Sequence, residues 1–214
     1  NFLNNTRVIW YETQENDTID IFTRLNMFKI PLTNAELVKA LFLNHDNFVS
    51  DGVFSSIDRS LLEEKIRLRQ FEISLEWDRI ETRLHGHDFW CFLTDPKKTI
   101  YPVRIELLLD MISQKPEGSE DFHTFNYFRE KVNEESKEDI LDSWNLIKRK
   151  FQTLEGWYQD KELYHKIGFL ICADYSLPKL LTLYDECMSK SIFIDCINER
   201  IGNIFEKTNI DKMG

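Results

Sequence analysis

Lys29 and the residues after it could form an anion-binding site. Thr33 and Glu36 have the spacing of a capping box, in which each side chain bonds the other residue's backbone N–H at the start of a helix. Pro31 restricts Ile30 to extended conformations, so the loop before this helix has little freedom. Free N–H groups and the helix dipole attract negative charge there, and Lys29 adds a positive charge. The spacing therefore predicts an anion site, and the plain alternative is a capping box that only begins a helix.

Two histidines and an aspartate could bind a metal ion. The sequence His85-x-His87-Asp88 offers two imidazoles and a carboxylate, which divalent transition metals accept as ligands. No further ligand can be identified by spacing, and the glycine between the histidines favours exposed turn residues. A metal-dependent enzyme that uses these three residues is one alternative that we keep.

Other catalytic patterns are missing or lack their usual context. The chain has no G-x-x-x-x-G-K-[ST], G-x-G-x-x-G, G-x-S-x-G or H-E-x-x-H sequence, so it lacks the signatures of P-loop NTPases, dinucleotide-binding enzymes, α/β-hydrolases and zinc proteases. Glu63-x-Lys65 and Glu135-x-Lys137 have the spacing of metal-dependent nucleases, but both fall in highly charged helical stretches. We attribute these two pairs to chance, and we expect His165, which precedes an apolar run, to have a core or packing role.

A strand and a helix must position Lys29. Residues Arg7–Glu12 are β-branched and aromatic, which predicts a short strand. Apolar residues at helical spacing from Ile19 to Leu25 predict a helix, with Arg24 and Asn26 pointing away from its apolar side. The start of the chain is thus expected to form a short strand–helix–helix unit.

From Ser60 onward the sequence predicts a helical bundle. Ser60 and Glu63 form a second capping-box pattern, and the apolar residues that follow recur every three, four or seven positions until a break at residues 85–87. A second long stripe, from Ile140 to Leu154, indicates a helix packed along its length. The predicted helices span residues 60–84, 89–93, 104–113, 122–132, 136–154, 161–172, 178–188 and 191–205.

Composition supports a mostly helical chain that is not a nucleic-acid binder over its whole surface. Only 7 Gly and 5 Pro occur in 214 residues, too few for many tight β-turns. The formal charge of −10 opposes general binding to phosphates. The basic run Lys148-Arg149-Lys150 is expected to be a solvated helix face, as is the acidic stretch before it.

The cysteines and tryptophans are expected to have structural roles. Cys91 and Cys172 lie in apolar runs and no C-x-x-C pair occurs, which predicts buried, reduced thiols and a cytoplasmic protein. Four tryptophans read as core residues: Trp77, Trp90, Trp144 and Trp157. No apolar run approaches the ~18 residues that a membrane span needs, so no membrane partner is expected.

Several motifs together resemble GmrSD-type restriction endonucleases. Phe22-x-Arg24-x-Asn26 and then Lys29-x-Pro31-Leu32-Thr33-x-Ala35-Glu36-Leu37-x-Lys39-Ala40 are similar to the end of the N-terminal domain of that family. Five further motifs resemble the helical middle of the same proteins. They are Trp77-Asp78-x-Ile80-Glu81-x-x-Leu84, Phe89-Trp90-x-Phe92-Leu93, Arg104-Ile105-x-x-Leu108-Leu109-Asp110, Trp157-Tyr158 and Leu163-Tyr164-His165-x-Ile167-Gly168.

The resemblance implies a parent protein that cleaves foreign DNA in bacterial defence against phage. Such a parent has a ParB-like domain that binds and hydrolyses a nucleoside triphosphate with a divalent metal, a helical middle, and often an HNH-type nuclease domain. Residues 1–50 then correspond to the C-terminal remnant of the ParB-like domain and residues 51–214 to the helical middle. The resemblance places six residues in or around the nucleotide pocket: Arg24, Asn26, Lys29, Thr33, Glu36 and Lys39.

The resemblance also implies that this chain alone does not react. The family's Asp-Gly-Gln-Gln-Arg signature and the His-x-x-Pro of the HNH part are both absent, and relatives carry Gly where this chain has Phe28. The chain begins at Asn1 without an initiator Met, so we expect it to be a non-catalytic central fragment without a cofactor of its own. Its partners would be the rest of the parent and, through it, DNA.

A helical module that binds another protein or dimerises, with no enzymatic role, is the principal alternative. Trp10 and Tyr11 would lose sheet neighbours in a fragment, so we expect them to find replacement contacts, for example in a homodimer.

Overall fold

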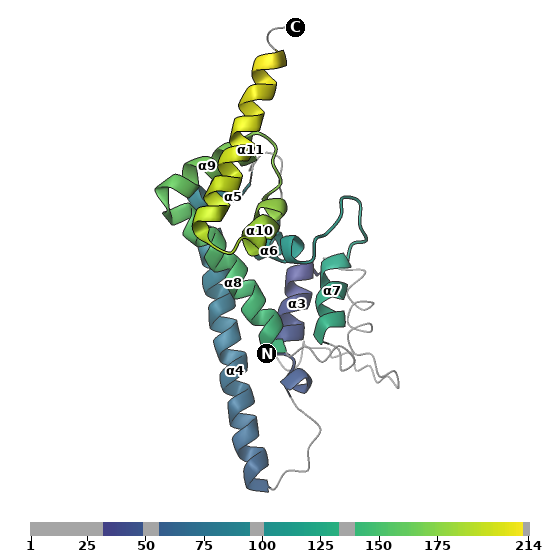
Figure 1. The fold of residues 1–214 in the computed structure, drawn as a ribbon. Helices are drawn as coiled ribbons and strands as arrows, with labels where there is room; N and C mark the ends of the chain where they lie inside the picture. Colours follow the sequence, from purple (N-terminus) through teal and green to yellow (C-terminus); the bar gives the residue numbers. More distant parts are fainter. Residues whose placement is uncertain (1–31, 49–55, 95–100, 133–139, 212–214) are drawn as a thin grey trace. The chain divides into compact units, whose positions relative to one another are not determined.

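The computed structural model describes residues 32–48, 56–94, 101–132 and 140–211 (Figure 1). Apart from Leu32, they belong to one compact unit, Thr33–Gly214. Every element of this described part is helical, which confirms the mostly α prediction. The elements are α3 (Asn34–Leu43), the 3-10 helix η1 (His45–Phe48), α4 (Ser56–Leu84), α5 (His87–Leu93), α6 (Ile105–Ile112), α7 (His123–Val132), α8 (Ile140–Gln159), α9 (Lys161–Cys172), α10 (Leu177–Glu186) and α11 (Lys190–Asp211).

The predicted helices are present, and an end differs from the prediction by four or more residues in three of them: α4, α11 and α8, which continues to Gln159 and not only to residue 154. α4 begins at Ser56, so Ser60 lies inside it and the second capping box is wrong; Glu63 instead bonds the imidazole of His45, with Nε2 and Oε2 3.0 Å apart. α11 continues to Asp211, beyond the predicted end at residue 205. The strand expected at Arg7–Glu12 and the helix expected from Ile19 lie outside the described residues.

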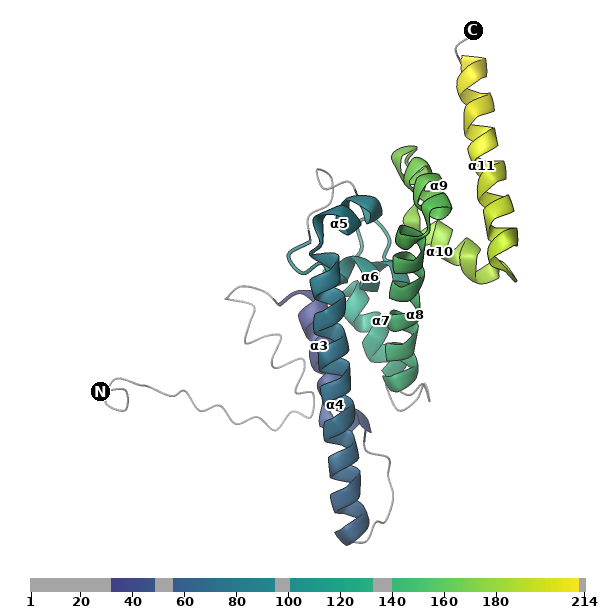
Figure 2. The ribbon, with the colours of Figure 1, turned by 90° about the vertical axis from the view of Figure 1, so that its left-hand side faces the viewer.

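Four helices meet around the side chains of Phe42 and Trp144. The Trp144 ring of α8 stacks on Trp77 of α4 with centroids 6.0 Å apart. Phe42 of α3 makes edge contacts with Trp144 at 6.0 Å and with Phe128 of α7 at 5.7 Å. These four side chains are buried, so the apolar stripes predicted on α4 and α8 face one another in the core (Figures 1 and 2).

A second group of aromatic contacts joins α5, α8 and α11. Phe89 and Phe92 of α5 contact Tyr158 of α8, with ring centroids 5.2 and 5.6 Å apart. Trp157 of α8 stacks on Phe193 of α11 at 5.3 Å, which continues the apolar contact into the last helix.

In the described part, no helix combines the length and the apolar character that crossing a membrane requires.

Candidate functional site

Half of the expected nucleotide-site residues can be located. Thr33 and Glu36 form the predicted capping box: Thr33 N donates to Glu36 Oε2 at 2.8 Å, and Glu36 N donates to Thr33 Oγ1 at 3.2 Å. Lys39 lies further along α3, where Nζ is 2.7 Å from Asp78 Oδ1 of α4. The capping box is therefore confirmed, and Lys39 bonds a neighbouring helix.

The other expected nucleotide-site residues are Arg24, Asn26 and Lys29. They fall outside the described residues, so their place in a pocket stays a prediction.

The start of α3 already meets a carboxylate of the same chain. Glu106 of α6 accepts hydrogen bonds from the Ala35 backbone N–H and from the Asn34 side chain, whose Nδ2 is 3.2 Å from Glu106 Oε1. A carboxylate in this position balances the partial positive charge of the helix N-terminus. The helix start was predicted to attract an anion, and at Ala35 the carboxylate of Glu106 already takes that place.

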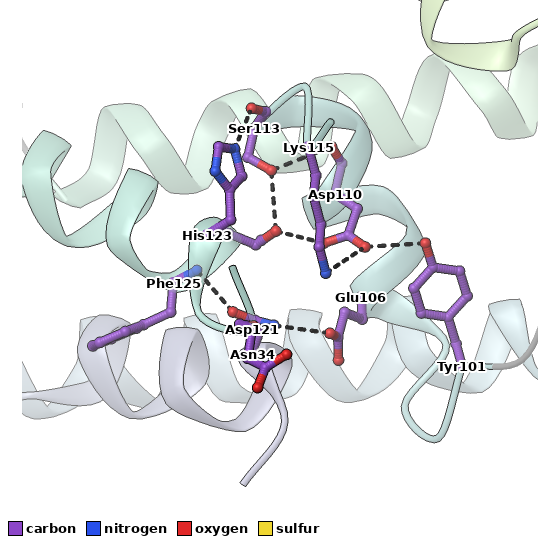
Figure 3. Close-up of polar contacts among 10 residues, drawn as sticks. Asn34, Tyr101, Glu106, Asp110, Ser113, Lys115, Asp121, His123 and Phe125 are labelled. Atoms are coloured by element: carbon purple, nitrogen blue, oxygen red, sulfur yellow. Dashed lines mark hydrogen bonds and ion pairs between the residues drawn. The ribbon is translucent and has the colours of Figure 1, made fainter. Parts of the chain in front are cut away.

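Asn34 joins three helices at this point (Figure 3). Besides the bond to Glu106, Asn34 Nδ2 donates to the Asp121 carbonyl at 2.8 Å, and Asn34 Oδ1 accepts the Phe125 backbone N–H at 3.0 Å. Phe125 is the third residue of α7, so Asn34 satisfies one of the N–H groups that a helix start leaves without a helical partner. The side chain is 6% exposed, and its three bonds tie α3 to α6 and α7.

Glu106 is a buried ionisable group at the centre of these contacts. It is 8% exposed, and one oxygen, Oε2, has no hydrogen-bond partner among the described residues. Burial raises the pKa of Glu106 above its ordinary value, and the charge of Asp110 acts in the same direction. The bonds from Asn34 and Ala35 and the charge of Lys115 oppose this shift without cancelling it.

Asp110, one turn further along α6, bonds three side chains (Figure 3). Thr124 Oγ1 donates to Asp110 Oδ1 at 2.5 Å, Tyr101 donates its hydroxyl to Oδ2 at 3.0 Å, and Lys115 Nζ lies 3.6 Å from Oδ2. Burial and the charges of Asp110 and Glu106 raise the pKa of Tyr101 well above its ordinary value. Tyr101 therefore stays a hydrogen-bond donor to Asp110 throughout the neutral range.

An open cavity of about 570 Å³ lies beside this cluster, and Tyr101, Asp110 and Lys115 line it. A general acid in the cavity would need a group that can give up a proton there. Glu106, whose raised pKa would suit that role, is not among the lining residues, and Asp110 is bonded to Thr124 and Tyr101. Asp110 and Tyr101 are thus used in bonds within the fold, and Glu117 is a further carboxylate that lines the cavity.

Sequence reasoning missed this cluster because its members are far apart along the chain. Asn34 and Glu106 are separated by 72 positions, and Asn34 and Phe125 by 91. One local signal was present: Glu106 and Asp110 are charged residues one turn apart in the otherwise apolar run Ile105–Ile112. Charges on both turns of so apolar a helix indicate buried partners elsewhere.

A second set of polar contacts closes the ends of α4 and α6. Glu81 accepts the backbone N–H groups of Arg104 at 3.0 Å and Ile105 at 2.8 Å, which caps the start of α6. Arg104 in return donates from Nη1 to the carbonyl of Leu84, the last residue of α4, at 2.9 Å, and its guanidinium lies 4.7 Å from the Trp90 ring centroid. Each helix thus provides the cap of the other.

The histidine motif does not come together as a metal centre. His85 Nε2 lies 3.2 Å from Glu81 Oε1, whereas His87 Nε2 lies 3.6 Å from the thiol of Cys91. Within the described ranges, no three His, Cys, Asp or Glu side chains are grouped so that they could hold a metal ion. Both histidines are exposed, as the turn reading expects.

The expected burial of Cys91 and Cys172 is wrong. Cys91 is exposed because helical geometry turns it outward between the buried residues of its apolar run, and Cys172 is exposed at the C-terminal end of α9. His165 is exposed as well, which excludes the core role; the packing role agrees with its ring contact to Tyr164, with centroids 5.4 Å apart. Apolar runs therefore overestimated the burial of these two cysteines.

The basic run on α8 is less solvated than expected. Lys148 is paired with Glu76 of α4 at 3.1 Å, and Lys150 is paired with Asp185 of α10. Only Arg149 is exposed, and it lines an open cavity of about 740 Å³ together with Lys150. Two of the three basic residues therefore contribute contacts between helices.

The chain was compared with protein-family models, with curated proteins and with solved structures, and no match was found.

Proposed function

We propose that this chain is a non-catalytic helical scaffold that couples the nucleotide and nuclease domains of a GmrSD-like, nucleotide-dependent DNA endonuclease of bacterial phage defence. One observation carries the proposal: polar residues of the motifs that resemble this family are engaged in capping helices. Glu81 and Arg104 cap α6 and α4, and Asp110 bonds Thr124 of α7. Residues that brace helix ends fit a supporting role, because the side chains of Glu81, Arg104 and Asp110 are each engaged in hydrogen bonds.

The position of α3 supports a coupling role. In the resemblance, α3 directly follows the loop that lines the nucleotide pocket, and it carries Thr33, Glu36 and Lys39. Its Asn34 is bonded to α6 and α7, and Lys39 is bonded to Asp78 of α4. A displacement of the N-terminal end of α3 would therefore be transmitted to α4, α6 and α7 through these bonds.

In this proposal, the parent binds a nucleoside triphosphate and a divalent metal, works in the cytoplasm and acts on DNA. Coding sequence upstream of Asn1 should then encode the Asp-Gly-Gln-Gln-Arg signature, and sequence downstream of Gly214 should encode an HNH-type His-x-x-Pro. A gene with neither signature contradicts the assignment.

The coupling role is tested in the intact parent with Asn34→Ala. We expect nucleotide hydrolysis to continue while DNA cleavage falls about 10-fold or more, in the range of ordinary coupling energies. Thr153→Ala is the control, because Thr153 is only partly buried and its hydroxyl donates to the Arg149 carbonyl of its own helix, so the hydrogen bond that the substitution removes lies within α8. Equal loss of both activities, or of neither, argues against coupling through α3. Full activity of Arg24→Ala and Asn26→Ala variants would refute their place in the pocket.

The alternative is a helical interaction or dimerisation module without an enzymatic role. The observation that favours it is a set of exposed apolar side chains on α4, at Leu61, Leu68, Phe71 and Leu75. An intact gene without the two signatures, together with self-association of the chain, would support this alternative.

A further inference from the structure

One face of α4 presents large apolar side chains to solvent. Leu61, Leu68, Phe71 and Leu75 are 55%, 56%, 61% and 54% exposed. The three leucines are seven residues apart and Phe71 lies between the second and third, which places all four on one side of the helix. Single exposed apolar residues are ordinary, but four on one helix face form a patch that suits a partner. We call this patch the Leu68 stripe.

The repeat of the Leu68 stripe indicates a helix as its partner. Ile66, Ile73 and Ile80 are also seven residues apart, and they are buried on the side of α4 that meets the chain's own helices. A seven-residue repeat of apolar side chains is typical of helices that pack lengthwise. α4 therefore has two such faces: the isoleucine face is buried within the chain, and the Leu68 stripe is exposed and open to another helix.

Charges inside the stripe select the direction of that helix. Glu64 and Asp78 are exposed and occupy positions of the same repeat as Phe71. Two copies of α4 packed in parallel would place Glu64 against Glu64 and Asp78 against Asp78, and like charges at such positions destabilise a helix pair. An antiparallel pair places Glu64 opposite Leu75 and Asp78 opposite Leu61. The charge of Asp78 is already balanced by Lys39.

Charges along the edges of the stripe fit the antiparallel register. With Leu68 opposite Phe71 of the second copy, Lys65 comes beside Glu72 of the second copy, and two-fold symmetry forms this pair twice. On the other edge, Arg67 comes beside Ser74 of the second copy, so like charges do not meet. Glu72 now bonds Arg69 of its own helix at 2.7 Å, an exposed pair that rearranges at little cost.

We propose that the Leu68 stripe binds the same stripe of a second copy of this chain, antiparallel and in the register that pairs Lys65 with Glu72. This inference holds whether or not the chain belongs to the proposed parent.

Sedimentation equilibrium of the 214-residue chain tests the proposal from about 1 to about 200 µM, a range that covers weak helix pairs. The proposal expects a monomer–dimer equilibrium. Leu68→Gln/Phe71→Gln should raise the dissociation constant at least about 100-fold, because four apolar side chains leave the two-fold interface. Both positions are exposed, so the variant should fold, as far-UV circular dichroism would verify.

Ile192→Gln is the matched control, since Ile192 is an exposed apolar residue of α11, away from the stripe. It should dimerise like the unmodified chain. A strict monomer throughout the range, a dimer unchanged by the stripe variant, or a dimer lost only in the control each overturns the proposal.

Charge reversal tests the antiparallel register separately. Lys65→Glu and Glu72→Lys, each alone, should weaken the dimer, because each brings two like-charged pairs together. The two substitutions combined restore opposite charges in the antiparallel pair and should restore the dimer. In a parallel pair, the Lys introduced at position 72 would meet Arg67 of the second copy, so the double variant would stay weak. Failure of the double variant to recover the dimer therefore excludes the proposed antiparallel register.

Discussion

Replacing Asn34 with alanine should lower the free energy of unfolding by roughly 3–5 kcal/mol. Three contacts disappear: the donation to the Asp121 carbonyl at 2.8 Å, the donation to Glu106 at 3.2 Å and the acceptance of the Phe125 N–H at 3.0 Å. A buried group left without a partner costs about 1–3 kcal/mol, and bonds to a charged group lie at the upper end. The sum exceeds the cost of an ordinary surface substitution by several fold.

Urea unfolding followed by tryptophan fluorescence measures this loss, since buried tryptophans report on the packed core. Thr153→Ala is the control and should stay within about 0.5 kcal/mol of the unmodified chain.

The Asn34→Asp variant separates the contributions of the three bonds: its carboxylate can still accept the Phe125 backbone N–H but repels the carboxylate of Glu106. It should therefore be less stable than Asn34→Ala at neutral pH and should recover as Glu106 becomes protonated. A loss below about 1 kcal/mol for Asn34→Ala would refute the view that this cluster holds the helices together.

Three further predictions concern charge, helix capping and thiols. The pKa of Glu106 is raised in the folded state above the ordinary 4.5, so the folded state binds more protons and this group's stabilising contribution fades as pH rises through the folded pKa. Relative to Glu106→Gln, the unmodified chain should lose stability between pH 4.5 and neutrality; a constant difference in urea midpoints across that range contradicts the burial argument. Arg104→Lys should lower the free energy of unfolding by about 1–3 kcal/mol, because lysine keeps the charge but not the fixed geometry of the cap and the ring contact; thermal unfolding that is unchanged would count against that cap. Cys91 and Cys172 should react with a thiol reagent before Cys187, which is partly buried and whose pKa is raised by burial; mass spectrometry of partly modified protein that finds Cys187 labelled first would oppose this order.

Long stripes of apolar residues made most of the fold predictable from the sequence. The residues from Ile140 to Leu154 on α8 recur at helical spacing and are buried as expected, and the helix over Lys161–Cys172 has the predicted ends. A periodic stripe is a strong signal because one face of a helix must be covered over its whole length.

Local patterns were less reliable where a longer-range contact decides the outcome. Ser60 and Glu63 have capping-box spacing, yet both lie inside α4, which starts at Ser56. The spacing misled because the same two residue types also occur three apart in the interior of a charged helix. Cys91 stands in an apolar run but points outward, since even the seven-residue helix α5 has an exposed side.

The partners within the polar cluster could not be predicted from local sequence, although the two charges of α6 indicate that buried partners exist. Asn34 and Glu106 meet only after α3, α6 and α7 have packed, and no spacing rule connects them. What the sequence did predict correctly is the capping box at Thr33 and Glu36, because its two partners lie within one turn of the chain. The anion site predicted near this capping box stays a prediction; Glu106 already places a carboxylate of the chain at the start of α3.

We propose that this chain braces helices and does not itself react. Incubating the purified 214-residue chain with nucleoside triphosphates and with plasmid DNA, each with Mg²⁺, tests this role through released phosphate and DNA breaks. We expect no hydrolysis of either substrate above a protein-free blank. Turnover of either substrate that is abolished by Glu106→Gln or Asp110→Asn, in a variant that still folds, would show that the chain reacts and would refute the proposed role.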